Sequence, residues 1–453
     1  MLDQTLVISD FFPTKTISDW EKMTKKVLKT DDLDRRLLFK SVEGIDLYPL
    51  HVNSHWICEL NSFPENVEIT SSNISNDKNI INLTTIHNSG ASIIQEIYFG
   101  CIQFVEQIKK NTTNIEIHIA LDSLYFSNIA KVRALRYIFE KLIEENKSKT
   151  SFKLISHNSL REQTLFDPWV NMLRSTASSM AAILGGADKI SSYSYDHLFV
   201  EYTGNKSSSL GSRNAENELK ILLEESHLDR VSDPMKGSHS IEAITYELIE
   251  KSWSLLIKNV ESFELNSFAK EVEETAKKRY KLAQSRKITI TGVNNFANPE
   301  DSFQKLFNTN IDLSKRIGDE QFPLRTVASE FETIRNNFKA DVNPVKVLVL
   351  DPESKVSARI NFCRNYFEVI GANVTEVKTI DDIKENDHVI ICGTDETYEK
   401  GLSEILKSFD TKKIKSTYVA GKIDITKYQG ISDSLYMGQN IFEVLSHFIK
   451  ELC

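Results

Sequence analysis

Hydrophobic and polar positions along this chain form blocks that predict short strands separated by amphipathic helices. Apolar or β-rich runs typical of strands lie at 80–86, 115–121, 152–156 and 190–193. Stripes with helical period lie between and after them, at 91–108, 131–145, 168–184, 214–228, 241–260 and 265–288. Strands that alternate with helices predict parallel βα units, and repeated units predict a barrel or a piece of one.

A second unit begins near residue 344. A polar connector at 295–343, with one predicted helix at 324–338, comes before it. The run at 345–350 is almost entirely apolar, as expected of a strand that is buried on both faces. Further strands are predicted at 373–377, 388–392 and 416–420, and helices at 357–370, 399–408 and 439–452. This alternation predicts a small, doubly wound, flavodoxin-like α/β domain.

The first forty residues predict an arm followed by a helix. Ser18 is a candidate N-cap, and Asp19 and Glu21 would favour the positive end of the helix. Apolar side chains recur at helical spacing, at Trp20, Met23, Val27 and Leu28. This stripe is expected to pack against the rest of the chain or against a partner.

Composition narrows the class of protein. The 453 residues are 40% hydrophobic and 26% charged, which is typical of soluble globular domains. The net charge of −9 argues against a general nucleic-acid binder. There is no apolar run near the roughly 20 residues that span a bilayer, and the start, Met1-Leu2-Asp3-Gln4, is unlike a secretory signal. We therefore expect a cytoplasmic protein that does not bind membranes.

Few residues suggest chemistry by themselves. Five cysteines lack metal-site spacing and are expected to be reduced thiols: Cys58, Cys101, Cys363, Cys392 and Cys453. The segments 185–188 (GGAD) and 233–238 (DPMKGS) indicate a helix stop and a turn. His87, His157 and His227 are predicted in or near βα junctions, where barrel active sites lie. No Walker loop and no G-x-G-x-x-G is present, so these residues define no reaction.

The order of several short motifs is more specific. They are LDRRLLFKSVEGIDLYPL at 33–50, HNSGASIIQE at 87–96, NMLRSTASSMAAILGGAD at 171–188, SRN at 212–214, EESHL at 224–228, DPMKGS at 233–238, Trp253, GVN at 292–294, YVAG at 418–421 and LYMG at 435–438. In this order they resemble the methylmalonyl-CoA mutase family, and in particular its small subunits. The resemblance covers most of the chain.

The resemblance implies a barrel joined to a cobalamin-binding-type α/β domain. In catalytic members, substrate-CoA threads the barrel, and adenosylcobalamin lies between the two domains. A D-x-H-x-x-G loop supplies the lower axial histidine to cobalt. The reaction is a radical rearrangement that interconverts (R)-methylmalonyl-CoA and succinyl-CoA, with the hard chemistry carried by the cofactor.

This chain departs from that pattern at two places. At the loop after 345–350, Glu353 stands where the family has histidine, and Val356 stands where it has glycine. The other departure is a shortened barrel, because only a few dozen residues separate Leu50 from His87. The family's R-x-Y-A-G-F substrate segment has no counterpart here. The family's H-M-Q-E-A-G-A motif also matches poorly at His87, so we assign that residue no catalytic role.

We therefore predict four regions: an arm and helix (1–40), a shortened mutase-like barrel (41–294), a helical connector (295–343), and a cobalamin-binding-like domain without the axial histidine (344–453). The predicted function is that of a small, non-catalytic mutase subunit with no catalytic, cofactor-binding or metal-binding residues of its own. Adenosylcobalamin is expected on a catalytic large subunit, with which the chain forms a heterodimer. Phe11, Phe12, Trp20 and Met23 are the expected anchors for that partner. One alternative is an acyl-CoA mutase that is active in its own right. Another is a cobalamin-binding carrier without mutase activity, which Glu353 disfavours.

Overall fold

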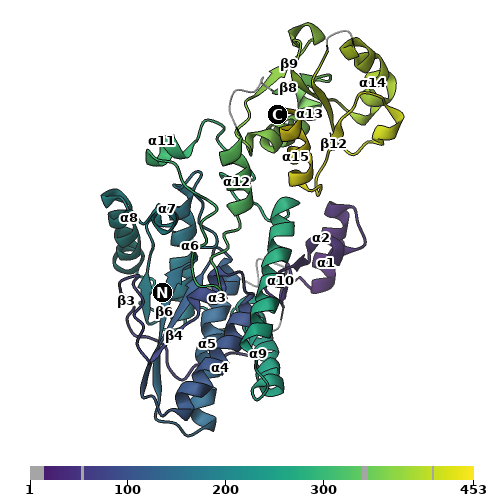
Figure 1. The fold of residues 1–453 in the computed structure, drawn as a ribbon. Helices are drawn as coiled ribbons and strands as arrows, with labels where there is room; N and C mark the ends of the chain where they lie inside the picture. The colour runs from purple at the N-terminus through teal and green to yellow at the C-terminus, as the bar shows by residue number, and fades with distance from the viewer. Residues whose placement is uncertain (1–14, 53–55, 339–344, 411–412, 453) are drawn as a thin grey trace, which may run out of the picture.

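The computed structural model describes residues 15–52, 56–338, 345–410 and 413–452. Two parallel five-stranded sheets, each with its own helices, follow one another along the chain (Figure 1). The expected α/β class with parallel sheets is therefore confirmed. None of the described helices is both long enough and apolar enough to cross a membrane. Of the predicted anchors, Phe11 and Phe12 lie outside the described residues.

The first sheet is open. Its strands are β3 (Glu68–Ile69), β4 (Ile80–Asn82), β5 (Asn114–Leu121), β6 (Ser151–Asn158) and β7 (Lys189–Ser191). They are paired in parallel in the order β3-β7-β6-β5-β4, so β3 and β4 are edges and do not pair with each other. The run at 80–86, predicted as one strand, is only partly a strand, because helix α3 (Thr84–Asn88) begins two residues after β4 ends.

Helices cover one face of this sheet. Its core is built by apolar residues that alternate along β5, such as Ile115, Ile117 and Ile119, with aromatic residues such as Phe104 and Phe139. The covering helices are α4 (Ile93–Lys109), α5 (Tyr125–Glu145) and α6 (Val170–Gly185). An outer helix, α9 (His239–Asn259), packs on α4 and α5, and α10 (Leu265–Gln284) follows it.

The opposite face of the sheet carries charges near the amino ends of its strands. The Nζ of Lys189 lies 3.6 Å from carboxylate oxygens of both Glu68 and Glu116, and the Nζ of Lys153 lies 3.7 Å from Glu68. Lys153 is about half exposed although it lies on a central strand. Parallel sheets are usually buried on both faces. This face is exposed to water because no further barrel strands of the described chain cover it. The cross-strand ion pairs stabilise it there.

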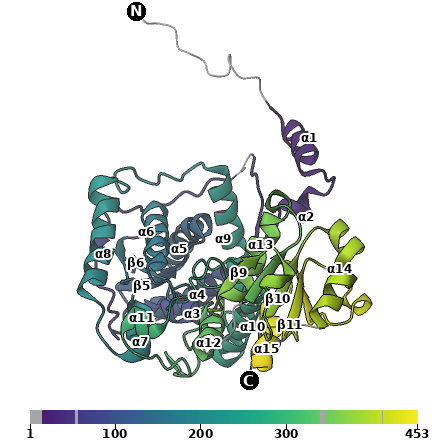
Figure 2. The same ribbon diagram turned by 90° about the horizontal axis from the view of Figure 1, so that it is seen from above.

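The N-terminal helix α1 (Ile17–Leu28) stands apart from both sheets, next to α2 (Leu33–Leu37), as Figures 1 and 2 show. The predicted N-cap was wrong. Thr16, not Ser18, caps the helix, because its side chain accepts the amide of Asp19 while Asp19 accepts the amide of Thr16. No residue of α1 is buried. A small β1–β2 hairpin (Phe39–Lys40 and Asp46–Leu47) leads on toward the first sheet.

Several shorter helices surround the carboxyl edge of the first sheet. They are α7 (His197–Thr203), α8 (Ser209–Lys220) with a π-helical turn at Ile221–Glu225, and the connector helices α11 (Phe303–Phe307) and α12 (Ser329–Asn337). The connector was predicted to hold a single helix at 324–338. The structure instead has two shorter ones, and residues 322–328 run as irregular chain over the sheet edge.

The second sheet has strands β8 (Val345–Val349), β9 (Val374–Val377), β10 (His388–Cys392), β11 (Ser416–Ala420) and β12 (Asp433–Leu435). Its order is β12-β11-β10-β8-β9, with every pair parallel. This is the flavodoxin-type order, whose switch point lies between the first and third strands. The helices are α13 (Glu353–Glu368), α14 (Asp395–Asp410) and α15 (Ile441–Leu452). Strand β12 was not predicted.

The two units share a core through the connector. Phe331 of α12 packs against Phe442 of α15, with ring centroids 4.6 Å apart. The amide of Val345, at the start of β8, donates to the carbonyl of Asn373, so the turn 370–373 lies at the amino edge of the second sheet. This turn and connector residues line a common pocket. Helix α12 thus packs along α15, and the end of the connector reaches the amino edge of the second sheet.

Candidate functional site

The carboxyl edge of a parallel sheet is where barrel proteins place their active sites. In the first sheet this edge is formed by residues that follow β4 to β7, including Asp122, Ser159 and Arg161. His87, on α3, lies at the same edge. It is fully buried, with Nδ1 2.8 Å from Glu96 Oε1 and Nε2 2.8 Å from Ser159 Oγ. Both ring nitrogens are therefore engaged inside the protein.

Burial lowers the pKa of His87 well below its ordinary value, and the neighbouring cations Arg161 and Lys131 lower it further. The ring is neutral under physiological conditions. A neutral imidazole with both nitrogens hydrogen-bonded and no exposed surface has no free nitrogen to offer to a substrate. The geometry of His87 is that of a residue that fixes the position of its neighbours.

Around His87 lies a buried network of three carboxylates and three cations. The carboxylates are Glu43, Glu96 and Asp122, and the cations are Lys131, Arg161 and Arg279. They come from the entry segment, α4, α5, α10 and the loops after β5 and β6. The formal charges cancel. Buried charges are tolerated when they are paired and hydrogen-bonded in this way.

Arg161 is central to the network. One nitrogen donates to Asp122 Oδ2 at 2.6 Å, and another donates to the carbonyl oxygens of His87 and Ala91 at 3.1 and 2.7 Å. Burial alone would raise the pKa of Asp122, but the Arg161 guanidinium outweighs it and the pKa is lowered. Asp122 is therefore a permanent anion and is unsuited to proton transfer.

The remaining members of the network have equally defined partners. Lys131 donates to Glu96 and, at 2.8 Å, to the carbonyl of Ala120. Arg279 donates to Glu43 Oε1 at 2.6 Å. None of these four charged residues had been singled out from the sequence. The sequence did contain one indication. Lys131 lies within an apolar helical stripe, between Ile129 and Leu135, and a charged residue at such a position implies a buried partner of opposite charge.

The connector covers this edge. The amide of Arg325 donates to the carbonyl of Asn88 at 2.9 Å, and the amide of Val327 donates to the carbonyl of Arg161 at 2.8 Å. Glu332 of α12 accepts the amide of Leu165 at 2.6 Å. The chain's own connector therefore lies where a ligand of the first sheet would have to enter.

The other two predicted histidines do not join His87. His157 lies on β6, with Nε2 2.7 Å from His118 Nδ1 and Nδ1 2.6 Å from Ser191 Oγ. His227 was wrongly predicted at a βα junction. It is exposed, follows the π-helical turn of α8 and precedes another helix. The sequence pattern could not show that helix α8 leads through His227 to another helix and not to a strand.

A pocket of about 450 Å³ lies at the open end of the same edge, where β3 and β7 finish. Most of the side chains that line it carry a hydroxyl group. The rings of Tyr193 and His197 are stacked there, with their centroids 4.3 Å apart. His197 is paired with Glu201 at 3.2 Å. Within the described residues, no group of three or more histidine, cysteine or acidic side chains is arranged to hold a metal ion.

The glycine and turn motifs have structural roles, as predicted. Gly186 ends α6 with a φ of 91°, and the adjacent Asp188 pairs with Arg136 at 2.6 Å. Asp233, in the turn before α9, pairs with the buried Arg133. These residues position helices and do not line the carboxyl edge.

The second sheet closes its carboxyl edge with side chains of its own. Asp351 accepts the amide of Thr394 at 2.7 Å and the hydroxyl of Thr397 at 2.9 Å, which joins the loops after β8 and β10. The Tyr398 hydroxyl accepts the amide of Gly393 at 2.7 Å and donates toward the carbonyl of Ala420 at 2.9 Å. The bonds of Asp351 cross the switch point between β8 and β10, where doubly wound proteins bind ligands, and those of Tyr398 tie β10 to β11.

The loop after β8 does not fit a cobalamin held by histidine. Glu353 is the first residue of α13, and Val356 is 1% exposed within the same helix. The histidine of this unit next in sequence is His388, which is fully buried in β10 with Nδ1 2.6 Å from Ser416 Oγ. No imidazole is therefore available at the loop where the family's axial ligand would stand.

Comparisons with known proteins agree with the order of motifs. The family model described as methylmalonyl-CoA mutase matches residues 60–322. The probable methylmalonyl-CoA mutase small subunit of Mycobacterium tuberculosis (strain ATCC 25618 / H37Rv) is 27% identical over 367 residues, covering 74% of this chain and 58% of the relative. The methylmalonyl-CoA mutase small subunit of Porphyromonas gingivalis is 26% identical over 419 residues, covering 81% and 65%.

A third relative, the methylmalonyl-CoA mutase small subunit of Streptomyces virginiae, is 32% identical over 229 residues, covering 46% of this chain and 36% of the relative. The chain spans less than two thirds of the length of each of these relatives. The family match covers more than half of the chain and includes the whole first sheet. The chain belongs to the methylmalonyl-CoA mutase family.

Proposed function

We propose that this chain is the non-catalytic small subunit of an adenosylcobalamin-dependent methylmalonyl-CoA mutase. That isomerase interconverts (R)-methylmalonyl-CoA and succinyl-CoA in propionate metabolism. In this proposal the chain has no catalytic, cofactor-binding or metal-binding residue. It stabilises a catalytic large subunit in a cytoplasmic heterodimer, and the large subunit binds the cofactor. The four predicted regions (1–40, 41–294, 295–343 and 344–453) are retained as its domains.

The observation that carries the proposal is that the carboxyl edge of the first sheet is closed around His87 and Arg161, beside the open pocket where β3 and β7 finish. A radical rearrangement needs a cavity that holds substrate beside the cofactor. At this edge, the space is taken by a charge-balanced buried network and by the connector above it. Opening the edge would break the contacts of Arg325 and Val327 and would expose unpaired charges.

The carboxyl edge of the second unit supports the same proposal. Hydrogen bonds from the Thr394 amide and the Thr397 hydroxyl to Asp351 cross its switch point. A cobalamin held by histidine would find no imidazole in the loop after β8, where Glu353 begins α13. The names of the relatives, which include the words small subunit, are consistent with a role beside a larger catalytic chain.

The proposal is tested with the chain purified alone and together with the catalytic mutase subunit of the same organism. Alone, with adenosylcobalamin and methylmalonyl-CoA added, it should give no turnover. Paramagnetic resonance of the reduced cobalamin should show no coupling to a protein nitrogen. With the catalytic subunit, size-exclusion chromatography with light scattering should show a stable complex.

Two results would contradict the proposal. Turnover by the chain free of any partner would establish the alternative, an active acyl-CoA mutase. A chain that stays monomeric at micromolar concentration beside its catalytic subunit would exclude the stabilising role. Loss of the catalytic subunit's thermal stability when this chain is omitted from co-expression is the supporting outcome.

A further inference from the structure

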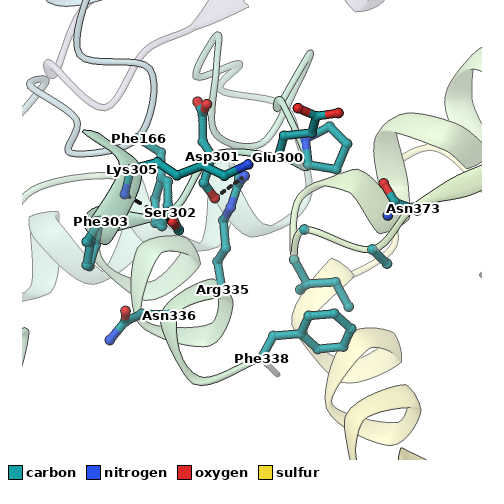
Figure 3. Close-up of a pocket in the computed structure, with 14 residues that line it drawn as sticks. Phe166, Glu300, Asp301, Ser302, Phe303, Lys305, Arg335, Asn336, Phe338 and Asn373 are labelled. Atoms are coloured by element: carbon teal, nitrogen blue, oxygen red, sulfur yellow. Dashed lines mark hydrogen bonds between the residues drawn. The ribbon is translucent and has the colours of Figure 1, made fainter. Parts of the chain in front are cut away.

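A pocket of about 390 Å³ lies where the connector meets the second unit (Figure 3). One wall comes from the connector, at 299–305 and 335–338, and the other comes from the turn 370–373 before β9. It lies at the amino edge of the second sheet, and Phe166, from the loop after β6, also lines it. No part of the proposed mutase role uses this pocket.

Arg335 of α12 lines the pocket and is 6% exposed. Its Nη2 donates to the main-chain carbonyls of Asn298 and Asp301, the latter at 3.1 Å. Its Cζ lies 4.3 Å from the centroid of the Phe166 ring. Its Nε and Nη1 are buried and have no hydrogen-bond partner among the described residues.

No carboxylate pairs with this arginine within the part of the chain that the structure describes. Glu332, one turn earlier on α12, is held on another side by the amide of Leu165 at 2.6 Å. Burial lowers the pKa of Arg335 to about 10, while Asp301 and Glu332 act to raise it. A buried guanidinium with two open N–H groups leaves a desolvation cost that an anion would offset.

The surroundings leave space for such an anion. Gly371 has a φ of +81°, and a Cβ added there would lie 3.7 Å from Arg335 Nε, so the glycine keeps the wall beside this nitrogen open. In Figure 3, Lys305 lies on one side of Arg335 and Asn373 on the other, and the carboxylates of Glu300 and Asp301 are turned away.

We propose that this pocket binds a small anion that carries a carboxylate or phosphate group, with Arg335 as its main ligand. Lys305, whose Nζ has no hydrogen bond or ion pair in the described structure, is the second cation, and Asn373 supplies a neutral donor. Phe338 and Ile370 form an apolar wall that accommodates a short carbon chain. The bound anion would join the connector to the second unit and stabilise their contact.

The test uses the full chain, with inorganic phosphate and acetate as separate probes at constant ionic strength. Isothermal titration and thermal shift should show saturable binding of at least one probe. The probe that binds assigns the anion as phosphate or carboxylate. The matched control is Lys287→Met, which removes an exposed lysine outside the pocket.

Arg335→Met should weaken binding by about tenfold or more, because a hydrogen-bonded charge is lost. Lys305→Met, at an exposed position that should fold normally, should weaken it by a smaller factor, and Lys287→Met should leave it unchanged. If Arg335→Met fails the circular-dichroism check for folding, Lys305→Met decides. Absence of saturable binding to the parent chain, or equal binding by Lys305→Met and the parent, would overturn the proposal.

Discussion

The two sheets of this protein are both parallel, and each has a carboxyl edge where related architectures bind ligands, but the two edges are closed in different ways. At the first, Arg161, Asp122 and Glu43 are fully buried, and a distant connector lies over them. At the second, Asp351 and Arg359 bond to loops a few dozen residues away and remain partly exposed to solvent.

This difference indicates two ways of closing a carboxyl edge. The first edge is blocked by long-range packing, so its closure is part of the stability of the whole unit. At the second edge, hydrogen bonds at the surface join neighbouring loops. These loops are part of the fold whether or not a ligand binds. Charges at the first edge should therefore matter much more for folding than charges at the second.

The largest expected effect separates the edges directly. Arg161→Met should reduce the free energy of unfolding by about 3–5 kcal/mol, because it leaves Asp122 buried without its cation. Arg359→Met removes a partly exposed pair with Asp395 and should cost less than about 1 kcal/mol. Urea unfolding of both variants measures the two values, and equal losses would break the comparison.

A region outside both edges sharpens the comparison, because under the proposed function the catalytic subunit binds a surface away from both edges. Helix α1 has no buried residue and exposes Met23. Under the proposed function, Trp20→Ala should weaken association with the catalytic subunit by about 2 kcal/mol or more. Deleting residues before Asp31 should weaken it further and leave the second unit folded.

Lys22→Ala is the control for Trp20→Ala, because Lys22 is an exposed polar residue of the same helix. Affinity is measured by titration, and the thermal midpoint of each free variant is measured separately. A lower thermal midpoint with unchanged affinity would mean that α1 packs on its own chain and is not an anchor.

The pH dependence of stability should have opposite signs at the two edges. Burial raises the pKa of Glu332, which holds the connector over the first edge, from 4.5 to about 7. Its contribution is present below about pH 4.5 and is lost as the pH rises through 7. The stability difference between the parent and Glu332→Gln should therefore fall by about 3 kcal/mol as the pH rises through this range, since each pKa unit corresponds to about 1.4 kcal/mol.

At the second edge, hydrogen bonds from the Thr394 amide and the Thr397 hydroxyl lower the pKa of Asp351. Its contribution is present above the ordinary value of 3.8 and is lost as the pH falls through the lower, folded-state value. The difference between the parent and Asp351→Asn should therefore shrink toward acid. Denaturant melts at several pH values check both signs, and a common sign would contradict the assignment.

Much of the second unit could be predicted because its strands are continuous apolar runs. Strands β10 and β11 have the predicted bounds, 388–392 and 416–420. Burial on both faces leaves few polar positions in such strands, so the run itself marks the element. The absence of an axial histidine at Glu353 is likewise a matter of residue identity and needs no coordinates.

Helix starts were predicted less well. Helices α5, α13 and α14 begin four to six residues earlier than expected, at Tyr125, Glu353 and Asp395. Their first turns carry polar residues or lack an apolar stripe, and they are held by contacts with other loops. Asp351, for example, fixes the start of α14 through Thr394 and Thr397. Periodicity along one segment cannot include such contacts.

The sequence by itself determined the α/β class, the two units, the family resemblance and the residue types at the loop after β8. Only the tertiary structure decided that the first sheet is open, that the connector covers its edge, and that Arg279 pairs with Glu43 from 236 positions away. The physical reason is that patterns of hydrophobicity specify which face of an element is buried. The partner of a buried charge is specified only when distant elements are packed together.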